Sequence, residues 1–279
     1  MSGTLYLVAT PIGNLEDITF RAVNVLKEVD IIACEDTRHT IKLCNHYNIK
    51  NKLVSYHEHN EVSMSESLIK ELIDGKNVAI VSDAGTPAIS DPGAVIVKQA
   101  IEQDINISPI PGPSAFVAAL ISSGLDTTKF TFFGFLSKRS KDRASQLESI
   151  AKFMTTVILY ISPHSYKNDI SDLYKYLGSR KIVVAREVTK IYETFLRGEL
   201  GADIIQNYEP RGEICVVIEG SREEIKNEDN PLLEVSIGEH LEFYLNQGVS
   251  RNKAMRLVAK ERKLSKNEVY DLILNEKKG

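Results

Sequence analysis

The sequence contains no tryptophan and only three cysteines, Cys34, Cys44 and Cys215, among its 279 residues. The cysteines lack C-x-x-C spacing and are odd in number, which argues against a disulfide scaffold and against a zinc site. We therefore expect no bound metal, and we interpret the three cysteines as reduced core thiols of a cytoplasmic protein.

Long apolar runs and a dominant charge are also missing. No apolar stretch reaches the roughly 20 residues that a membrane-spanning helix needs, and residues 1–10 lack the basic flank and apolar run of a signal peptide. The net charge of -4 gives no overall attraction to nucleic acid, so an RNA partner would have to meet a local basic patch. We therefore expect a globular chain that does not enter a membrane and forms about two domains.

Apolar runs and helical patterns alternate five times before residue 122. Strands are expected at 4–9, 30–34, 53–56, 78–81 and 105–110. This alternation, with short connections, predicts an α/β domain with a mainly parallel sheet and helices on both faces. A second α/β domain with more antiparallel character is expected from the strand patterns at 130–136, 157–161, 182–185, 193–196 and 214–218.

A charged segment that is poor in apolar residues separates these domains from a small basic tail. The tail shows helical patterns at 239–246, 251–260 and 266–274, and the last two resemble a helix-turn-helix. A solvated charged face and contact with nucleic acid are both open for this tail. The expected divisions are an N-terminal domain at 1–121, a linker at 122–129, a second domain at 130–220, a linker at 221–236 and the tail at 237–279.

The loop at 82–93 is the strongest indication of a ligand site. Walker (G-x-x-x-x-G-K-[ST]) and Rossmann (G-x-G-x-x-G) motifs are absent, which disfavours the common nucleotide sites. This loop follows an apolar strand, contains Gly85 and Gly93, and offers hydroxyl and carboxylate groups. Because ligands bind at the carboxyl ends of strands in open α/β sheets, we expect a site here. Within the loop, Asp91 and Pro92 are interpreted as the N-cap and first residue of the next helix.

Polar clusters follow the other strands of the first domain as well, so they should line the same edge of the sheet. Glu35 is placed to point into the crevice as a general base or hydrogen-bond acceptor, whereas Asp36 is interpreted as a helix N-cap. His57 and His59 alternate at a strand end, but without a third ligand at recognisable spacing they are interpreted as polar residues at the edge of the site.

A second basic cluster spans 137–143 and opens a helix. Cations at a helix N-terminus oppose the macrodipole, which indicates an external anion such as RNA phosphate. The charged segment 186–190 also ends a strand, and a surface ion pair is its simpler interpretation. The expected RNA contacts are Arg38, Lys138, Arg139, Lys141, Arg143, Arg251, Lys253 and Arg256.

Five motifs together resemble a known family. They are VATPIGNLEDIT (8–19), EDTRHT (35–40), YHEHNE (56–61), SDAGTPAISDPG (82–93) and PIPGPSA (109–115). In this order they resemble the 16S rRNA cytidine 2'-O-methyltransferase branch of the tetrapyrrole methylase superfamily, and the resemblance runs from about Leu5 to Ile218. It implies a two-domain α/β fold that binds S-adenosylmethionine in the cleft between the domains, usually in a homodimer. The implied target is the decoding-centre cytidine at position 1402 of 16S rRNA in the small ribosomal subunit.

The resemblance and the loop composition together assign the site residues. The expected cofactor contacts are Pro11, Ser82, Asp83, Ala84, Gly85, Thr86, Ile89, Ser114, Ala115, Tyr160, Ile161 and Thr189. Methyl transfer is an in-line displacement, so most of the barrier reduction can come from alignment. A carboxylate is expected to accept the ribose hydroxyl proton, with Glu35 as the first candidate and Glu187 as the second.

One segment departs from the family pattern, and two other functions stay open. Where a Glu-x-Pro-His-Arg-like segment is expected, the chain has ISPHS at 161–165, which puts the contacts of that segment in doubt. A tetrapyrrole-ring methyltransferase of the same fold is disfavoured by the first loop, ATPIGN at 9–14, which is not of the G-x-G-x-P type, and by the basic tail. A non-catalytic rRNA-binding assembly module would bind RNA but show no cofactor-dependent thermal shift.

Overall fold

A computed structural model describes residues 2–221, 232, 235–262 and 264–276. The chain forms two compact units, Met1–Ser221 and Arg222–Gly279, and each is considered by itself. Most of the linker expected at 221–236 lies outside the described residues, so that boundary stays a prediction. None of the described helices is long and apolar enough to cross a membrane.

The first sheet is wholly parallel, as its alternating sequence pattern predicted. Its strand order is β3-β2-β4-β1-β5. The interior strands β2 and β4 consist only of buried residues, whereas the edge strand β3 is partly exposed, as expected for a sheet covered on both faces. The five strands are β1 (Thr4–Val8), β2 (Ile31–Cys34), β3 (Lys52–Ser55), β4 (Val78–Val81) and β5 (Asn106–Ile110).

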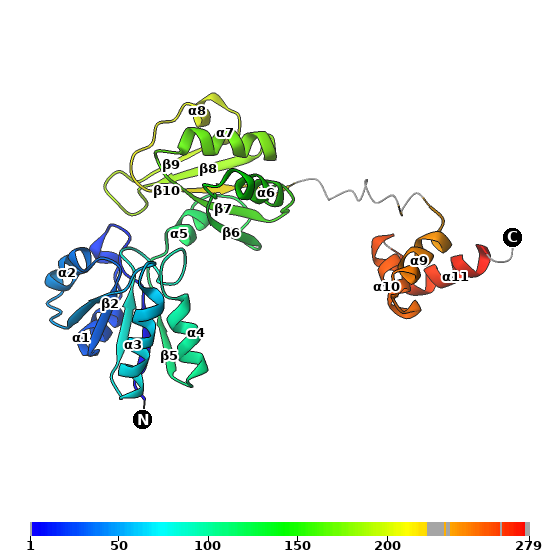
Figure 1. The fold of residues 1–279 in the computed structure, drawn as a ribbon. Coiled ribbons are helices and arrows are strands. Elements are labelled where there is room, and N and C mark those ends of the chain that lie inside the picture. Colours follow the sequence, from blue (N-terminus) through cyan, green and yellow to red (C-terminus); the bar gives the residue numbers. More distant parts are fainter. Residues whose placement is uncertain (1, 222–231, 233–234, 263, 277–279) are drawn as a thin grey trace. The chain divides into compact units, whose positions relative to one another are not determined.

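Helices cover both faces of this sheet (Figure 1). One face packs against Ala22 and Leu26 of α1 and Cys44 of α2, and the other packs against α3 and α4. A short 3-10 helix, η1, precedes α1. The bounds are η1 (Leu15–Asp17), α1 (Phe20–Glu28), α2 (Thr37–His46), α3 (Glu61–Ile73) and α4 (Ala94–Glu102).

The chain leaves the central neighbours β1 and β4 in opposite directions. From β1 it crosses β4 to reach β2, and from β4 it crosses β1 to reach β5. The helices that follow, α1 and α4, accordingly lie on opposite faces of the sheet. A crevice opens where adjacent connections diverge in this way, and it is the usual ligand site of open α/β sheets. The topology therefore places the loops at 9–19 and 82–93 on the two sides of that crevice.

The second sheet has the order β6-β7-β10-β8-β9. Only β6 and β7 are parallel, and all other pairs are antiparallel, which confirms the mixed character expected from sequence. The strands expected at 193–196 and 214–218 do not pair with each other, because β9 and β10 lie on opposite sides of β8. The strands are β6 (Phe130–Phe135), β7 (Thr156–Ile161), β8 (Lys181–Arg186), β9 (Thr194–Glu199) and β10 (Ile214–Ile218).

Helix α5 (Ala115–Ile121) follows the last strand of the first sheet but packs on the second. Its Ala119 and Leu120 join a buried cluster with Ile158 and Val217 of the second sheet, and Figure 1 shows α5 lying beneath that sheet. The opposite face is covered by α6 (Ser140–Ala151), α7 (Tyr166–Leu177) and α8 (Asp203–Gln206). The domain limit expected at residue 121 thus separates α5 from the sheet that it covers, and these limits stay a prediction.

In the described part of the second unit, three helices surround a small apolar core. They are α9 (Ile237–Asn246), α10 (Arg251–Glu261) and α11 (Lys266–Glu276). Their core includes Leu241, Val258 and Val269, and Ser236 and Glu239 form a capping box at the start of α9. The predicted helical tail is therefore present, with each helix within about three residues of its expected bounds.

Candidate active site

A cavity of about 510 Å³ lies at the carboxyl edge of the first sheet, walled on its other side by β7 and β10. Nine of the twelve expected cofactor contacts line it, namely Asp83, Ala84, Gly85, Thr86, Ile89, Ser114, Ala115, Tyr160 and Ile161. They come from the loops after β4 and β5 and from the end of β7, which follows the β5 loop by about 45 residues. The shared edge inferred from the sequence therefore brings seven of these residues to one cavity, and the second sheet supplies Tyr160 and Ile161.

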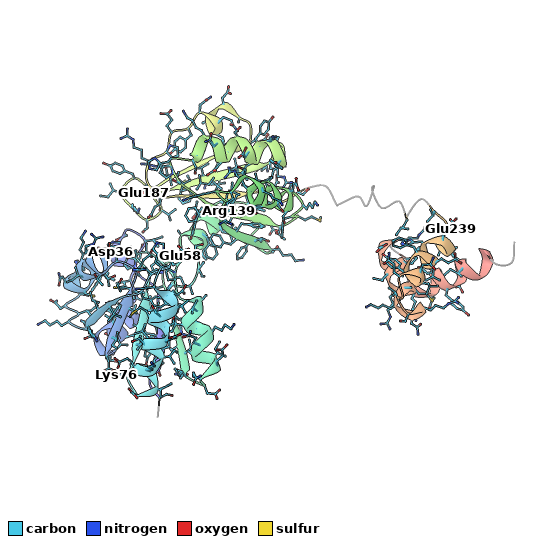
Figure 2. The ribbon with its side chains drawn as sticks, viewed as in Figure 1. Asp36, Glu58, Lys76, Arg139, Glu187 and Glu239 are labelled. Atoms are coloured by element: carbon cyan, nitrogen blue, oxygen red, sulfur yellow. The ribbon has the colours of Figure 1, made fainter. Side chains whose placement is uncertain are left out.

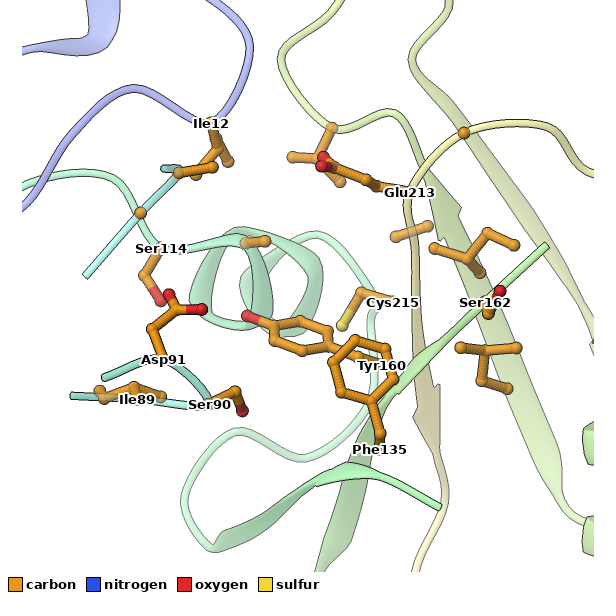
Figure 3. A pocket seen from close by; sticks show the side chains of 18 of the residues that line it. Ile12, Ile89, Ser90, Asp91, Ser114, Phe135, Tyr160, Ser162, Glu213 and Cys215 are labelled. Atoms are coloured by element: carbon orange, nitrogen blue, oxygen red, sulfur yellow. The ribbon is translucent and has the colours of Figure 1, made fainter. Parts of the chain in front are cut away.

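The walls are mainly apolar, with a few polar groups at fixed places. Ile12, Ile89, Phe135 and Ile214 supply apolar surface, and Figure 3 shows Asp91 and Ser114 among the polar side chains that point into the space. Apolar surface with a few convergent polar groups is the usual character of a small-molecule site. The cavity therefore suits a ligand with a flat apolar part and a charged or hydroxylated part.

Backbone and hydroxyl contacts hold the two loops of the crevice together. The N–H of Thr10 donates to the carbonyl of Gly85 at 2.9 Å, and the N–H of Gly85 donates back to Thr10 at 3.0 Å. The Thr10 hydroxyl donates to the Ser82 carbonyl at 3.1 Å, and the Thr86 hydroxyl donates to the Pro113 carbonyl at 3.2 Å. The cavity wall is therefore a connected set of loops and not a group of independent connectors.

The loop at 82–93 also holds unusual backbone conformations. Ala88 and Ser90 have φ angles of 66° and 62°, which cost energy in residues other than glycine. Gly93 has a φ of 143°, and a Cβ at this position would lie 3.0 Å from the Cβ of Ala88. Such strain persists only where the surrounding structure enforces it, and it clusters at ligand sites.

Asp91 does not cap the following helix, so the interpretation from sequence was wrong. The N-cap of α4 is Gly93, which has no side chain to contribute. The Glu61 carboxylate, from the start of α3, accepts from the Gly93 N–H at 2.8 Å instead. Asp91 lines the cavity instead, where burial, and then the Glu35 carboxylate, raise its pKa to about 6 although a hydrogen bond with Ser82 opposes them.

Glu35 belongs to the same group of carboxylates without lining the cavity. Burial raises the pKa of Glu35, and the Asp83 carboxylate raises it further. Asp83 accepts from the Asp36 N–H at 3.1 Å and lies 3.8 Å from Nδ1 of His39. Like charges held close together disfavour ionisation. The sequence thus located Glu35 and Asp83 but missed Asp91, for which the raised pKa is the distinguishing signal.

Neighbouring residues of this edge have internal roles. The Asp36 side chain accepts from the Arg38 N–H, so its predicted N-cap role is confirmed, and hydrogen bonds from the Arg38 guanidinium lower the pKa of Asp36 to about 2. Asp36 and Glu58 lie at the same end of the first sheet in Figure 2, opposite Lys76. The His57 and His59 rings form an edge contact with centroids 5.9 Å apart.

Glu187, the second candidate base, is held in an internal network. Its carboxylate oxygen accepts from the Glu213 N–H at 2.8 Å and from Lys190 at 3.0 Å. Burial would raise its pKa, but these hydrogen bonds outweigh that effect and lower it. Because Glu187 lines no described cavity and is already paired, the geometry favours a structural brace.

Three expected cofactor contacts lie outside the main cavity. Pro11 and Ser82 line a second cavity of about 370 Å³ next to it. Thr189 lines neither, because its hydroxyl donates to Asp17 at 2.5 Å and its N–H donates to Glu193 at 2.6 Å. Its neighbour Val188 lines the main cavity instead.

Most of the expected RNA contacts have exposed side chains, but one is held in ion pairs within the protein. Lys138, Lys141 and Arg139, which is the N-cap of α6, are exposed, as are Arg251, Lys253 and Arg256 on α10. Arg38 is 89% exposed although it pairs with Asp36. Arg143 is only 19% exposed and donates to Asp169 at 2.7 Å and to Asp172 at 2.8 Å, so we do not include it in an RNA surface.

The segment at 161–165, which departs from the expected family pattern, contributes uncharged residues to the wall of the main cavity. Ile161, Ser162 and Pro163 line the main cavity. The Ser165 hydroxyl donates to Asp169 at 2.6 Å, the same carboxylate that binds Arg143. The segment therefore completes the apolar lining and is anchored to α7.

Comparisons of the sequence and of the fold with known proteins identify the family of this chain. Residues 4–203 match the family Tetrapyrrole (Corrin/Porphyrin) Methylases. Ribosomal RNA small subunit methyltransferase I of Halalkalibacterium halodurans is 48% identical over 97% of this chain and 94% of its own, and the protein of the same name from Bacillus subtilis is 47% identical over 96% and 93%. A crystal structure of diphthine synthase, 16% identical, shares the fold over 78% of this chain and 90% of its own, with a TM-score of 0.63. The chain is a methyltransferase that belongs to the tetrapyrrole methylase family and is similar over nearly its whole length to ribosomal RNA small subunit methyltransferase I.

Proposed function

We propose that the protein methylates the 2'-hydroxyl of a cytidine in 16S rRNA, with S-adenosylmethionine as the methyl donor. The observation that carries this proposal is the cavity at the sheet edge, in a chain 48% identical to a protein named ribosomal RNA small subunit methyltransferase I. As the family resemblance implies, we place the target at position 1402 in the small subunit and expect a homodimer.

The cavity fits this cofactor by its chemistry. Ile12, Ile89 and Ile161 offer apolar surface for the adenine ring, and Ser90 and Ser114 offer hydroxyls to its ribose and amino acid groups. Asp91 provides a half-buried carboxylate for the cationic part of the molecule, because attraction between opposite charges is strong where water is partly excluded. The cofactor supplies a methyl group activated by a sulfonium, while the protein supplies binding and alignment.

The proton of the ribose hydroxyl must leave as the new bond to oxygen forms. The carboxylates of Glu35, Asp83 and Asp91 interact with one another at the cavity edge, and burial raises the pKa of Glu35 and Asp91. A base whose pKa lies closer to the working pH is a better proton acceptor. We therefore assign the proton acceptor to this carboxylate cluster rather than to Glu187, which is already hydrogen-bonded to Lys190.

The decisive experiment is transfer of labelled methyl to small ribosomal subunits that lack the modification, mapped by resistance of the ribose to alkaline cleavage. One protected cytidine in the decoding region is the expected result. Cofactor binding without methyl transfer to RNA would favour a methyltransferase that acts on a tetrapyrrole ring. Absence of cofactor binding would favour a non-catalytic RNA-binding module.

A further inference from the structure

The second cavity shares a wall with the main cavity. Ile12, Asp83, Ala84 and Glu213 line both spaces. The remaining walls of the second cavity come from the loop after β1, from α2 and from Lys190 of the β8–β9 loop. The two cavities therefore adjoin, and a ligand in one would lie next to a ligand in the other beside these four residues.

The lining of the second cavity differs from that of the main one. Lys42 of α2 is exposed and His39 has a 55% exposed side chain, so two groups that can carry positive charge face solvent at its edge. Leu15 and Leu43 supply apolar surface in the same cavity. Cations beside apolar surface suit a phosphate joined to a flat ring system, which is the composition of a nucleotide.

The loop that carries Lys190 is held rigidly beside this cavity. Thr189 is bound to Asp17 of η1 and to Glu193, as described above, and Glu187 and Thr189 have positive φ angles of 51° and 67°. The Lys190 side chain crosses Gly13, where a Cβ would lie 2.4 Å from its Cε. The loop is therefore joined to the segment after β1 by the Thr189–Asp17 hydrogen bond and by close packing of Lys190 on Gly13.

The tip of the same loop exposes apolar side chains. Ile191 is 95% exposed and Tyr192 is 69% exposed, directly after Lys190. Because both side chains are mostly exposed, packing within the loop does not account for them. RNA-binding proteins commonly stack unpaired bases on exposed aromatic rings of this kind.

We infer that the second cavity binds the extruded target nucleotide of single-stranded RNA, while exposed Tyr192, on the loop that also carries Lys190 of the cavity wall, offers a ring to a neighbouring base. This inference rests on the proposed function, because it places the ribose hydroxyl directly beside the methyl donor where the two cavities adjoin. Asp83 lines both cavities, so a carboxylate of the proposed acceptor cluster lies at the side of the place where the two ligands would meet. Extrusion of the nucleotide also explains how a ribose in folded RNA reaches a recessed cavity.

The test uses variants that either obstruct the second cavity with a larger side chain or remove a positive charge from it, and that leave the residues of the main cavity unchanged. Leu15, 40% exposed, lines only the second cavity, and Leu15→Trp should obstruct it. The matched control is Ile73→Trp, which changes a 51% exposed residue of α3 that lines neither cavity. Lys42→Ala removes a cation from the wall, and Lys98→Ala is its control on the exposed side of α4. Melting temperatures show whether each variant is folded.

Binding to unmodified small subunits is measured by co-sedimentation, cofactor binding by calorimetry and methyl transfer by label. We expect Leu15→Trp and Lys42→Ala to weaken binding of the small subunit about tenfold, or to raise the KM of methyl transfer for the subunit to the same extent. Cofactor affinity should be unchanged in these variants, and both control variants should behave like wild type. Wild-type subunit binding and transfer by both variants would overturn the inference.

A failure of the proposed function looks different. If the wild-type protein transfers no methyl but its subunit binding is weakened by Leu15→Trp and Lys42→Ala and not by the controls, the cavity is an RNA site of a protein with another activity. If wild-type transfer occurs and all four variants match it, the function stands and the second cavity is not the nucleotide site.

Discussion

The Glu61 carboxylate accepts a hydrogen bond from the backbone N–H of Gly93 at 2.8 Å, across 32 positions of the chain. The same oxygen accepts from the Tyr56 hydroxyl at 3.1 Å and lies 3.4 Å from the N–H of Val95. One acidic side chain therefore supplies the N-terminal cap that α4 lacks locally and holds the end of the loop at 82–93.

Removing that carboxylate should destabilise both the helix and the site. Loss of an N-cap acceptor typically costs about 1 kcal/mol, so Glu61→Ala should lower the melting temperature by several degrees. It should also weaken cofactor binding, because the loop at 82–93 supplies seven residues to the wall of the main cavity. Glu61→Gln keeps an acceptor oxygen and should lose less of both. Equal losses in the two variants would contradict the capping role.

Asp91 should make the protein less stable as pH rises. Its folded-state pKa of about 6 is above its usual value of about 4, so between these pH values the native state holds a proton that the unfolded state has released. Stability therefore falls as pH rises from about 4 to about 6 and stays lower above that. Asp91→Asn should raise the free energy of unfolding by about 1 kcal/mol at pH 8, after allowance for solvent screening.

Thermal unfolding of wild type and Asp91→Asn at pH 8 and pH 4 checks this. The two proteins should differ at pH 8 and nearly coincide at pH 4, where the aspartic acid is neutral. A variant that is less stable than wild type at pH 8 would show that the carboxylate makes favourable contacts outweighing its burial.

The pH dependence of methyl transfer should report the carboxylate cluster. If the cluster accepts the proton, the rate should rise as pH increases through about 6, as the carboxylates ionise. After burial, the Glu35 charge is the largest cause of the raised Asp91 pKa, so Glu35→Gln should move the half-maximal rate to lower pH. Glu187→Gln, in which the brace to Lys190 is changed instead, should leave that pH in place. A profile that moves with Glu187→Gln and not with Glu35→Gln would reverse the assignment.

Gly93 should tolerate no side chain. Gly93→Ala adds a Cβ 3.0 Å from the Cβ of Ala88 and 3.2 Å from its backbone nitrogen, in addition to the strain of a positive φ. Gly124 also has a positive φ, 76°, but open space around its Cβ position. Gly93→Ala should therefore be less stable than Gly124→Ala by about 1–3 kcal/mol, the usual range for overpacking, measured by chemical denaturation. Equal losses would mean that only the backbone angle matters.

The sequence predicted the edge of the sheet well because parallel strands end on the same side, whatever their order. Glu35, Asp83 and Ser114 each follow an apolar run, and that local rule is enough to bring them together. The strand order itself, with β4 inserted between β2 and β1, depends on contacts between distant segments and leaves no local pattern.

Asp91 shows why the remaining site residues were harder to predict. An Asp-Pro pair before an apolar helix satisfies the local capping pattern, yet the cap comes from Glu61 in another helix. Similarly, Arg143 fits a basic cluster in sequence, and only the position of α7 reveals that Asp169 and Asp172 already bind it. In both cases a partner distant in sequence changed the role of a residue that the local pattern had assigned.

The main cavity has walls that are made at different times during synthesis. Ile12 and the loop at 82–93 leave the ribosome early, but Tyr160 and Cys215 complete the opposite wall only when β7 and β10 have been added. A ligand stabilises only a state that binds it, so the cofactor cannot assist the first sheet while the chain is being made. That sheet must fold on its own apolar core, and protection from proteolysis by the cofactor should begin only with chains that extend through β10.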